Sequence, residues 1–542
     1  MSDTTLRQPS PRAIRARATA RRRSDAVRAP LAGAVAALAG IGASELVAGF
    51  LGGPSLLAAI GEFAIDHQPP GAKDLVVGWF GTNDKVALET LIVVVALAVG
   101  AILGVLAVRR SFAIAAVAFG AFAVVGFFAA IGSPAASPTT AMIVALVAAV
   151  VSIQGLSFLL ATAGAGRASA GGAAAAAGPS WSRRAFVIQA AGIAVASSAA
   201  AVVGRRILET GVTGVLGGAT SGAAASPLPG PAVTATIPAG AELSAPGLTP
   251  LVVPNDQFYR IDTALIVPTV DAATWRLRIH GLVDREVTLS YGDLAEMPLV
   301  EEYVTISCVS NEVGGNLVGN AKWTGVRLRD VLGMAGVQAA ATQLVGRSAD
   351  GWTAGMPTAW VMDPSREPLI ALKMNDAPLP RAHGFPARLI VPGLYGYVSA
   401  TKWLTELELT TLEAFDGYWV PLGWSKEGPI LTQSRIDVPK NGASVAAGRV
   451  PIAGVAWAPD RGISKVEVAI DGAWQEAQLS TPISKTTWVQ WLLALDSTTV
   501  GPGTHTIEVR ATDGTGQVQT SDRTPPAPDG ARGHHAIRVT TG

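Results

Sequence analysis

Five long apolar segments in the first 210 residues constrain the fold of this chain more than any other feature of its sequence. A helix needs about 20 apolar residues to cross the hydrocarbon core of a bilayer, which is roughly 30 Å thick. The sequence therefore predicts a membrane domain over residues 29–208 with about five transmembrane helices. We expect these spans near Leu31–Leu51, Val86–Val108, Phe112–Ile131, Thr140–Ala163 and Ala185–Val203.

The arginines near the ends of these spans predict how the chain is oriented, because loops on the cytoplasmic side carry an excess of Lys and Arg. Residues 1–28 contain eight arginines and are expected to form a basic cytoplasmic tail. Arg109 and Arg110 follow the second span, and Arg167 and the pair Arg183–Arg184 lie between the fourth and fifth. Five spans place all three groups on one side. The sequence thus predicts a multi-pass plasma-membrane protein whose C-terminal half is extracytoplasmic.

The fifth span and a short neighbouring segment carry further features. Ser182–Ala201 has paired arginines, a nearby phenylalanine and an Ala/Gly-rich run, and it resembles an internal twin-arginine export signal. Ordinary cytoplasmic anchoring by the two arginines explains the same residues, and the sequence leaves both interpretations open. Ser55–Asp66 is apolar but short and carries two acids, which favours an interfacial or re-entrant segment.

Ionisable residues within the spans bear on what the helices do. Intramembrane b-type haem needs paired axial histidines, and none of the six histidines lies in a predicted span, so we expect no haem in this chain. Glu45 is an acid inside the first predicted span, and it indicates a polar contact or a proton site.

The rest of the chain has the sequence pattern of a linker and two globular domains. Residues 209–254 are rich in Gly, Ala, Ser and Pro, and this composition predicts a flexible tether. Residues 255–436 mix strand and helix patterns and predict an α+β domain. Residues 437–542 contain short alternating strands with Asp-Gly turns, which predicts an immunoglobulin-like β-sandwich. His534 and His535 are expected to be solvated rather than metal-binding.

The single cysteine, Cys308, is the most informative residue of the α+β domain. One cysteine excludes an intramolecular disulfide, and the net charge of +1 gives no indication of a nucleic-acid partner. Cys308 follows an alternating apolar run and precedes a loop with three glycines. A lone cysteine is more often a buried small hydrophobe than a reactive thiol. Local pattern alone therefore favours an inert role.

Three stretches together resemble the sulfite oxidase family of molybdopterin enzymes, in its membrane-anchored bacterial form. The first is a strand leading into ISCVSN at Cys308, and the second is NDAPLPRAHGFPARLIVPGLYGYVSATKWL at Asn375–Leu404. The third is GYWVPLGWSKEGPILTQSRID at Gly417–Asp437. The resemblance runs from about Pro250 to the C-terminus. It implies a molybdopterin-binding domain over residues 255–436 and an immunoglobulin-like dimerisation domain over 437–542, hence a possible homodimer.

The resemblance implies a molybdenum–pyranopterin cofactor with Cys308 as the one protein ligand, and the residue chemistry agrees. A thiolate is a soft donor suited to this metal. Arg388 and Lys402 suit the phosphate of the pterin, the arginine as a bidentate fork and the lysine as a point charge. The full set of expected cofactor-binding residues is Asn255, Tyr259, Arg260, Asp262, Thr263, Cys308, Asn311, Asp350, His383, Arg388, Ser399, Thr401 and Lys402.

The implied reaction is two-electron oxygen-atom transfer, with electrons exchanged with a separate protein because no fused haem domain is visible. Glu312 and Val313 stand where sulfite-oxidising members carry arginines, and an acid there is expected to repel sulfite in a low-dielectric pocket. Ala382 replaces an acid that usually precedes the motif histidine. We therefore expect a small S-oxide or N-oxide as substrate. Sulfite oxidation is the alternative, with Arg260 or Lys322 as compensating cations.

Two hypotheses from other classes remain. A cofactor-free descendant could serve as an extracytoplasmic binding module, but such a module has no need of Cys308, His383, Arg388 and Lys402 together. A transporter with an exported domain is the third hypothesis, and the absence of paired ionisable residues at mid-span disfavours it.

Overall fold

The computed structural model describes residues 11–69, 79–80, 84–132, 136–163, 183–210, 228–446, 448–498 and 500–542. It divides into two compact units. The first, which we call the helical unit, comprises Met1–Ala223 and Ala264–Val267. The second, the C-terminal unit, comprises Ala224–Thr263 and Pro268–Gly542.

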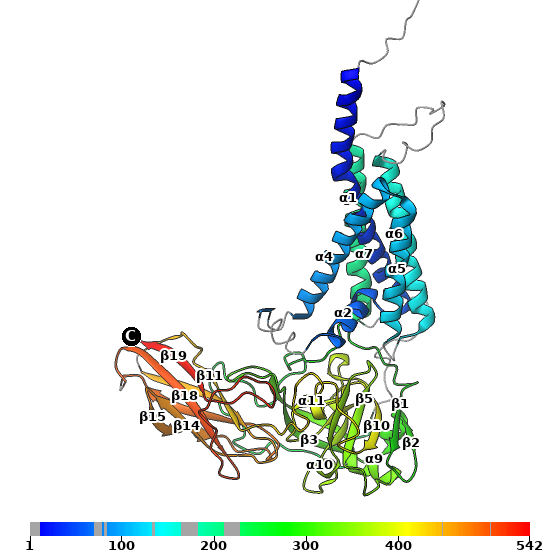
Figure 1. Ribbon diagram of the computed structural model, residues 1–542. Helices are drawn as coiled ribbons and strands as arrows, with labels where there is room; N and C mark the ends of the chain where they lie inside the picture. The colour runs from blue at the N-terminus through cyan, green and yellow to red at the C-terminus, as the bar shows by residue number, and fades with distance from the viewer. Residues whose placement is uncertain are drawn as a thin grey trace, which may run out of the picture. The chain divides into compact units, whose positions relative to one another are not determined.

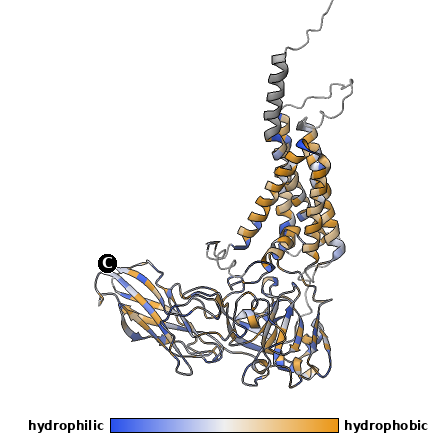
Figure 2. Ribbon diagram, viewed as in Figure 1, coloured by the Kyte–Doolittle hydropathy of each residue, from blue (hydrophilic) through white to orange (hydrophobic). Residues whose placement is uncertain are grey.

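The helical unit contains the predicted membrane helices. Five of its helices have a stretch long and apolar enough to cross a membrane, and each stretch begins and ends close to a predicted span. Apolar residues dominate these helices in Figure 2. The helices of this unit are α1 (Pro11–Leu51), α2 (Leu56–Asp66), α4 (Asp84–Arg109), α5 (Phe112–Ile131), α6 (Pro138–Ala163) and α7 (Arg183–Thr210) (Figure 1). The prediction of a multi-span helical anchor is confirmed.

Glycine lets helix α1 approach two of its neighbours backbone to backbone. A Cβ added to Gly33 would lie 1.9 Å from the carbonyl oxygen of Gly100 in α4. A Cβ added to Gly49 would lie 2.7 Å from the carbonyl oxygen of Gly204 in α7. Small residues at such crossings are typical of membrane helix packing, where van der Waals contact replaces the hydrophobic effect.

Glu45 makes the polar contact that its sequence position indicated. Its side chain is buried, and one carboxylate oxygen accepts a hydrogen bond of 2.6 Å from the Ser55 hydroxyl. Ser55 in turn caps the N-terminus of α2 by accepting from the amide of Ala58 at 3.1 Å. The acid in α1 therefore fixes the start of α2. An interfacial position for α2 stays a prediction.

Two sheets, one mixed and one antiparallel, form the core of the α+β domain in the C-terminal unit. One has the order β2 (Val287–Ser290), β1 (Arg276–Gly281), β10 (Leu404–Thr410), β5 (Gln343–Ser348) and β6 (Thr353–Pro357), with β1 and β10 parallel. The other has the order β3 (Leu299–Ser307), β4 (Val318–Arg327), β7 (Leu369–Met374) and β8 (Ala377–Pro378), with β9 (Arg388–Ile390) beside β7. Along the chain, the strands of these two sheets alternate with short helices, which are α8 (Tyr291–Glu296), α9 (Leu328–Ala335), α10 (Thr358–Met362), the 3₁₀ helix η2 (Arg381–His383) and α11 (Gly396–Ser399).

Local sequence explains several of these boundaries. Ser290 and Asp293 form a capping box at the start of α8, and their Ser-x-x-Asp spacing is typical of a helix N-terminus. Helix α9 ends at Gly336, whose φ of +72° is a conformation that glycine adopts without strain. The alternation of Trp275, Leu277 and Ile279 with two arginines puts the apolar side chains of strand β1 in the core.

The last hundred residues form the predicted β-sandwich. One sheet has the order β11 (Gln433–Val438), β13 (Arg449–Trp457), β17 (Val489–Asp496) and β16 (Gln478–Leu479). The other has the order β12 (Ser444–Val445), β19 (His535–Thr541), β18 (Gly503–Asp513), β14 (Ile463–Ile470) and β15 (Ala473–Glu476). Apolar side chains from both sheets form one buried cluster. It includes Ile452 and Trp491 of the first sheet and Val466, Val509 and Ile537 of the second.

Two expectations about the chain around these domains are wrong. Of the predicted tether, residues 209–254, the stretch 211–227 lies outside the described residues. Residues 228–254 are not a flexible tether, because the amide of Val253 donates to the carbonyl of Asn320 and the carbonyl of Leu251 accepts from the Trp488 indole. Nor is His534 solvated: its side chain is 7% exposed and lies 2.7 Å from Glu508. Its neighbour His535 accepts a 3.0 Å hydrogen bond from the amide of Ile436. Long-range hydrogen bonds, invisible in composition, account for both differences.

Candidate functional site

Cys308 lies where the strand pair β3–β4 opens into a loop. Ser307 is paired with Val318 at the end of the ladder, so residues 308–317 connect the two strands. The thiol-bearing residue is buried, and its amide donates to the carbonyl of Leu317 at 2.9 Å. The Asn311 side chain accepts a 2.8 Å hydrogen bond from the amide of Leu317. Asn311 therefore closes the loop that carries the cysteine.

Arg388 is a fully buried cation at the start of β9. Its Nη1 donates to the carbonyl of His383 at 3.0 Å, and its guanidinium lies 5.0 Å from the Trp323 ring centroid. In the part of the chain that the structure describes, no carboxylate is within 4 Å, and Nε is buried without a hydrogen-bond partner. Burial lowers the pKa of Arg388 to about 10. A desolvated cation of this kind is suited to binding an anion.

Lys402, Arg260 and Asp262 together form a second charged group. The Lys402 ammonium donates to Asp262 at 3.0 Å and to the carbonyl of Ala382 at 3.1 Å. Arg260 makes a two-pronged contact with the same carboxylate at 2.8 and 3.1 Å. Burial lowers the pKa of Lys402 to about 8, with Arg388 and Arg260 adding to that effect against Asp262. Two cations share this one carboxylate, so the group is net positive. Thr263 follows directly and is half-buried.

His383 is held in one tautomer beside these cations. Its Nε2 lies 2.9 Å from the carbonyl oxygen of Asn255, so Nε2–H is the donor and Nδ1 is left as an acceptor. Burial, then the charges of Lys402 and Arg388, lower the pKa of His383 to about 4. The imidazole therefore stays neutral between pH 5 and 8. The Asn255 side chain itself donates to the carbonyl of Met374 at 3.1 Å.

Two tyrosines lie within electrostatic range of Cys308. Burial, and then the cysteine, raise the pKa of Tyr259, while Arg388 opposes them. Burial raises the pKa of Tyr395 to about 12, and Cys308 contributes. Both phenols are therefore protonated at neutral pH. Tyr395 was not among the predicted site residues, although it lies inside the motif segment Asn375–Leu404 that identified its neighbours.

The remaining predicted residues differ in what their side chains contact. Thr401 is completely buried, and its hydroxyl has no hydrogen-bond partner among the described residues. Asp350 is also near the cluster: it accepts from the amide of Trp352 at 3.1 Å, and burial raises its pKa. Ser399 donates to the carbonyl of Tyr395 at 2.9 Å. Its hydroxyl is thus used within α11.

The donor set of this cluster fits a molybdenum–pterin group. A buried thiol supplies a soft ligand, and two buried cations match a phosphate. The unpartnered Nε of Arg388 and hydroxyl of Thr401 are costly to bury unless something bonds to them. No group of three or more His, Cys, Asp or Glu able to hold a metal occurs among the described residues, so Cys308 is not part of a multidentate protein site there.

The charges near the substrate position differ from expectation. Glu312 is exposed, so its carboxylate is screened by solvent and does not act in a low-dielectric pocket, and the predicted short-range repulsion of sulfite is wrong. The two candidate compensating cations are both paired. Lys322 lies 3.4 Å from Glu301 and 2.6 Å from Asp376, and Arg260 is paired with Asp262.

The stability of the cofactor-free protein is expected to rise with pH because of Lys402. Its pKa falls from 10.5 unfolded to about 8 folded, so its charge destabilises the fold below pH 8, and the penalty is relieved as pH rises toward 10. The full shift corresponds to roughly 3 kcal/mol. Thermal unfolding in detergent, followed by tryptophan fluorescence, tests this. The gain from pH 8 to 10 should be smaller in Lys402→Met; equal gains would contradict it.

Comparison with known proteins agrees with this site. A family model described as the oxidoreductase molybdopterin binding domain matches residues 264–419, and a bacterial Ig domain matches residues 433–509. Mouse mitochondrial sulfite oxidase is 33% identical over 290 residues, which is 45% of this chain and 52% of that protein. The chain thus spans about half the length of the sulfite oxidases it matches.

Two further proteins align with this chain over a larger share of their own length. The uncharacterized oxidoreductase YuiH of Bacillus subtilis is 34% identical over 158 residues, 29% of this chain and 76% of YuiH. The crystal structure of the sulfane dehydrogenase SoxCD from Paracoccus pantotrophus aligns with a TM-score of 0.47 and 21% identity, over 55% of this chain and 86% of that one. The family match and the YuiH likeness show that this chain belongs to the sulfite oxidase family of molybdopterin-binding oxidoreductases.

Proposed function

We propose that this protein is a membrane-tethered, molybdopterin-dependent oxidoreductase that carries out two-electron oxygen-atom transfer. The observation that carries the proposal is a buried thiol and a buried cation, Cys308 and Arg388, that both lie within electrostatic range of Tyr259. The Nε of Arg388 and the hydroxyl of Thr401 have no hydrogen-bond partner among the described residues. A cofactor-free binding module would leave those donors unsatisfied, at a cost of about 1–3 kcal/mol for each neutral group and more for a charged one. Family membership supports the same conclusion.

We assign roles to the residues by their chemistry. Cys308 ligates the metal as a thiolate, and Arg388, Lys402 and Thr401 bind the phosphate of the pterin through the donors that the fold leaves available. His383, held as the Nε2–H tautomer, offers Nδ1 as an acceptor to the pterin. When bound, the molybdenum–pterin group supplies reversible oxygen-atom transfer coupled to a two-electron change. Asn255, Arg260, Asp262, Thr263, Asn311, Asp350 and Ser399 shape the backbone and charges around it.

We propose a small neutral S-oxide or N-oxide as substrate. Arg260 and Lys322 are each paired with carboxylates, while Tyr259 and Tyr395 near Cys308 are protonated phenols able to donate to a neutral oxo group. The S–O or N–O bond breaks and the oxygen leaves as water, which requires two protons and two electrons from a separate redox protein. Sulfite oxidation is the alternative, and the names of the mammalian relatives favour it.

A substrate screen on the full chain separates these reactions. The protein, purified in detergent from a host that makes the cofactor, is assayed for reduction of dimethyl sulfoxide, methionine sulfoxide and trimethylamine N-oxide with a reduced dye. Sulfite oxidation is assayed with an oxidised dye. We expect at least one oxide to be turned over with kcat/KM about tenfold above that for sulfite. A preference for sulfite would overturn the substrate proposal.

We further propose that the C-terminal unit lies outside the cytoplasm. The five candidate spans and the arginine-rich N-terminus support this orientation. A twin-arginine export route and a homodimer through the β-sandwich belong to the same proposal. A reporter that works only outside the cytoplasm, such as alkaline phosphatase, is expected to be active when it is fused after Gly542. A fusion that is active only in the cytoplasm would contradict the five-span topology.

A further inference from the structure

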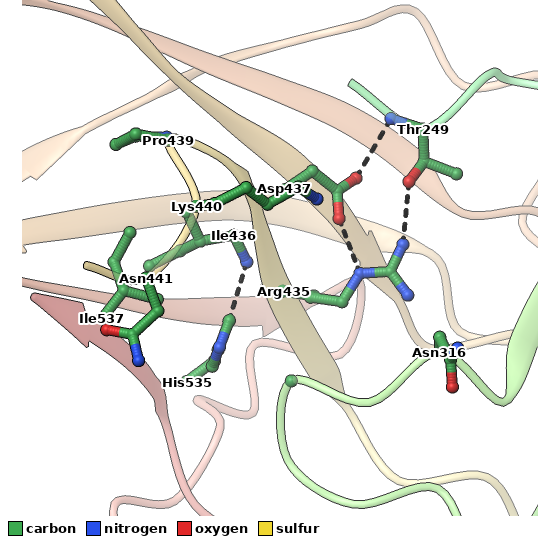
Figure 3. A pocket seen from close by; sticks show the side chains of 11 residues that line it. Thr249, Asn316, Arg435, Ile436, Asp437, Pro439, Lys440, Asn441, His535 and Ile537 are labelled. Atoms are coloured by element: carbon green, nitrogen blue, oxygen red, sulfur yellow. Dashed lines mark hydrogen bonds and ion pairs between the residues drawn. The ribbon is translucent and has the colours of Figure 1, made fainter. Parts of the chain in front are cut away.

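The loop between Cys308 and Leu317 is held by the β-sandwich as well as by its own hydrogen bonds. Arg435 on strand β11 donates from Nη1 to the carbonyl of Gly315 at 2.9 Å. Its Nη2 donates to the Thr249 hydroxyl at 2.9 Å. One guanidinium thus joins the sandwich, the cysteine loop and the segment that precedes the α+β domain. Figure 3 shows its bond to Thr249.

Asp437 fixes the direction of that guanidinium. Its carboxylate accepts from Arg435 Nε at 2.7 Å and from the amide of Thr249 at 3.2 Å. The two side chains are 9% and 5% exposed, so solvent screens the pair only weakly. Arg435 and Asp437 line a cavity of about 350 Å³ together with Asn316 of the loop. Figure 3 shows the bond between Arg435 and Asp437.

A second contact presses the sandwich against the same loop. Gly314 has a φ of +79°, and a Cβ added there would lie 2.3 Å from Cδ2 of His535. His535 is itself fixed, because its Nδ1 accepts from the amide of Ile436 on β11. Glycine at position 314, which the cofactor roles leave unexplained, is therefore required by the close approach of a sandwich side chain.

The strand that leads into Cys308 is held by the same domain. The amide of Trp488 donates to the Thr305 hydroxyl at 2.8 Å, and the Thr486 hydroxyl donates to the carbonyl of Tyr303 at 2.8 Å. Both acceptors lie on β3. The sandwich thus contacts the backbone before and after the cysteine.

We infer that Arg435 is a positioning residue of the cofactor site: through Gly315 it fixes the loop that closes on the amide of Cys308. The consequence for turnover rests on the proposed function, whereas the mechanical link does not. Through Arg435 the β-sandwich becomes part of the machinery that orients Cys308 and the residues where substrate approaches, in addition to any role in dimerisation. Loss of Arg435 should loosen the loop without removing the cofactor-binding cations.

Hydrogen–deuterium exchange on the full chain in detergent tests the mechanical link. Arg435→Met removes the donors to Gly315, Thr249 and Asp437. The peptide covering residues 309–317 is expected to exchange about 10–100-fold faster, because a buried charged hydrogen bond no longer holds it closed. Arg510→Met is the matched control, since it removes a sandwich ion pair with Glu467 that does not involve the loop. Unchanged exchange in Arg435→Met, or equal acceleration in the control, would overturn the inference.

Two further variants keep the test decisive. Thr249→Val removes one acceptor of Arg435 with little change in volume, and it should accelerate exchange of the same peptide by a smaller factor. If Arg435→Met does not fold, this variant decides, and unchanged exchange would contradict the link. Arg435→Lys should recover only part of the protection, because one ammonium does not replace a fork with three acceptors.

Turnover then separates positioning from simple stability. With the best substrate of the screen, Arg435→Met should keep its molybdenum content and lower kcat/KM about tenfold or more, with Arg510→Met near wild type. A loosened loop with kcat/KM unchanged would refute the positioning role. If wild-type protein binds no molybdenum, the proposed function fails, and the exchange experiment still reports on the contact itself.

Discussion

Replacing Cys308 with serine is expected to abolish turnover while leaving the protein folded. The thiolate is the one protein ligand that we assign to the metal, and a serine hydroxyl is a hard and weakly acidic donor that replaces it poorly. We expect activity to fall by more than about 100-fold. Even a mutation of a residue that only hydrogen-bonds to a metal ligand typically costs about 10–100-fold in activity, and loss of the ligand itself should cost more. Steady-state turnover on the preferred substrate, with molybdenum content measured on the same sample, gives the result.

The controls for this variant follow from the packing. Cysteine and serine have similar volumes, and the site is buried, so the destabilisation should stay below about 3 kcal/mol. Ser307→Ala is the matched neighbour: it removes only weak hydroxyl contacts of 3.3 and 3.5 Å, and it should keep activity within tenfold of wild type. Full activity in Cys308→Ser would refute the ligand assignment.

Replacing Arg388 with methionine should have opposite effects on cofactor retention and on the stability of the cofactor-free fold. Arg388 is 2% exposed and has no carboxylate within 4 Å among the described residues, so its charge is buried at a cost. Exchange of such a group for an apolar side chain of similar volume stabilises a protein by about 1–4 kcal/mol. The same change removes the main cation proposed for the phosphate. Molybdenum content should fall below a tenth of wild type.

Arg347→Met is the matched control for this second variant. Arg347 lies on strand β5 of the other sheet, is partly exposed and is paired with Glu408. Its loss should change stability by no more than about 1 kcal/mol and leave the metal content intact. Melting temperatures of the cofactor-free forms, read by tryptophan fluorescence, and metal analysis of the loaded forms test both effects. A destabilised Arg388→Met that retains its metal would contradict the phosphate-binding role.

The parts of this fold that depend on local pattern could be predicted from the sequence. Span length gave the five membrane helices, and period-two alternation gave β1, β13, β14 and β18. The capping box at Ser290 and the glycine that ends α9 are also local features. The role of Cys308 was different, because local chemistry favoured an inert thiol and only distant motifs identified the site.

What the sequence could not indicate depends on contacts between distant segments. Residues 228–254 have the composition of a tether, but their order comes from partners such as Asn320 and Trp488, far along the chain. The exposure of Glu312 depends on how its loop folds, which motif position does not indicate. The bonds from Arg435 to Gly315 and Thr249 cross 120 and 186 residues. Such pairs require the folded structure to be seen.

The central claim is that this chain binds a molybdenum–pterin cofactor at Cys308, and metal stoichiometry tests it most directly. Full-length protein from a host that synthesises the cofactor should contain close to one molybdenum atom per chain by inductively coupled plasma mass spectrometry, with an equivalent amount of pterin released on denaturation. Less than a tenth of an equivalent of both in folded wild-type protein would contradict the account.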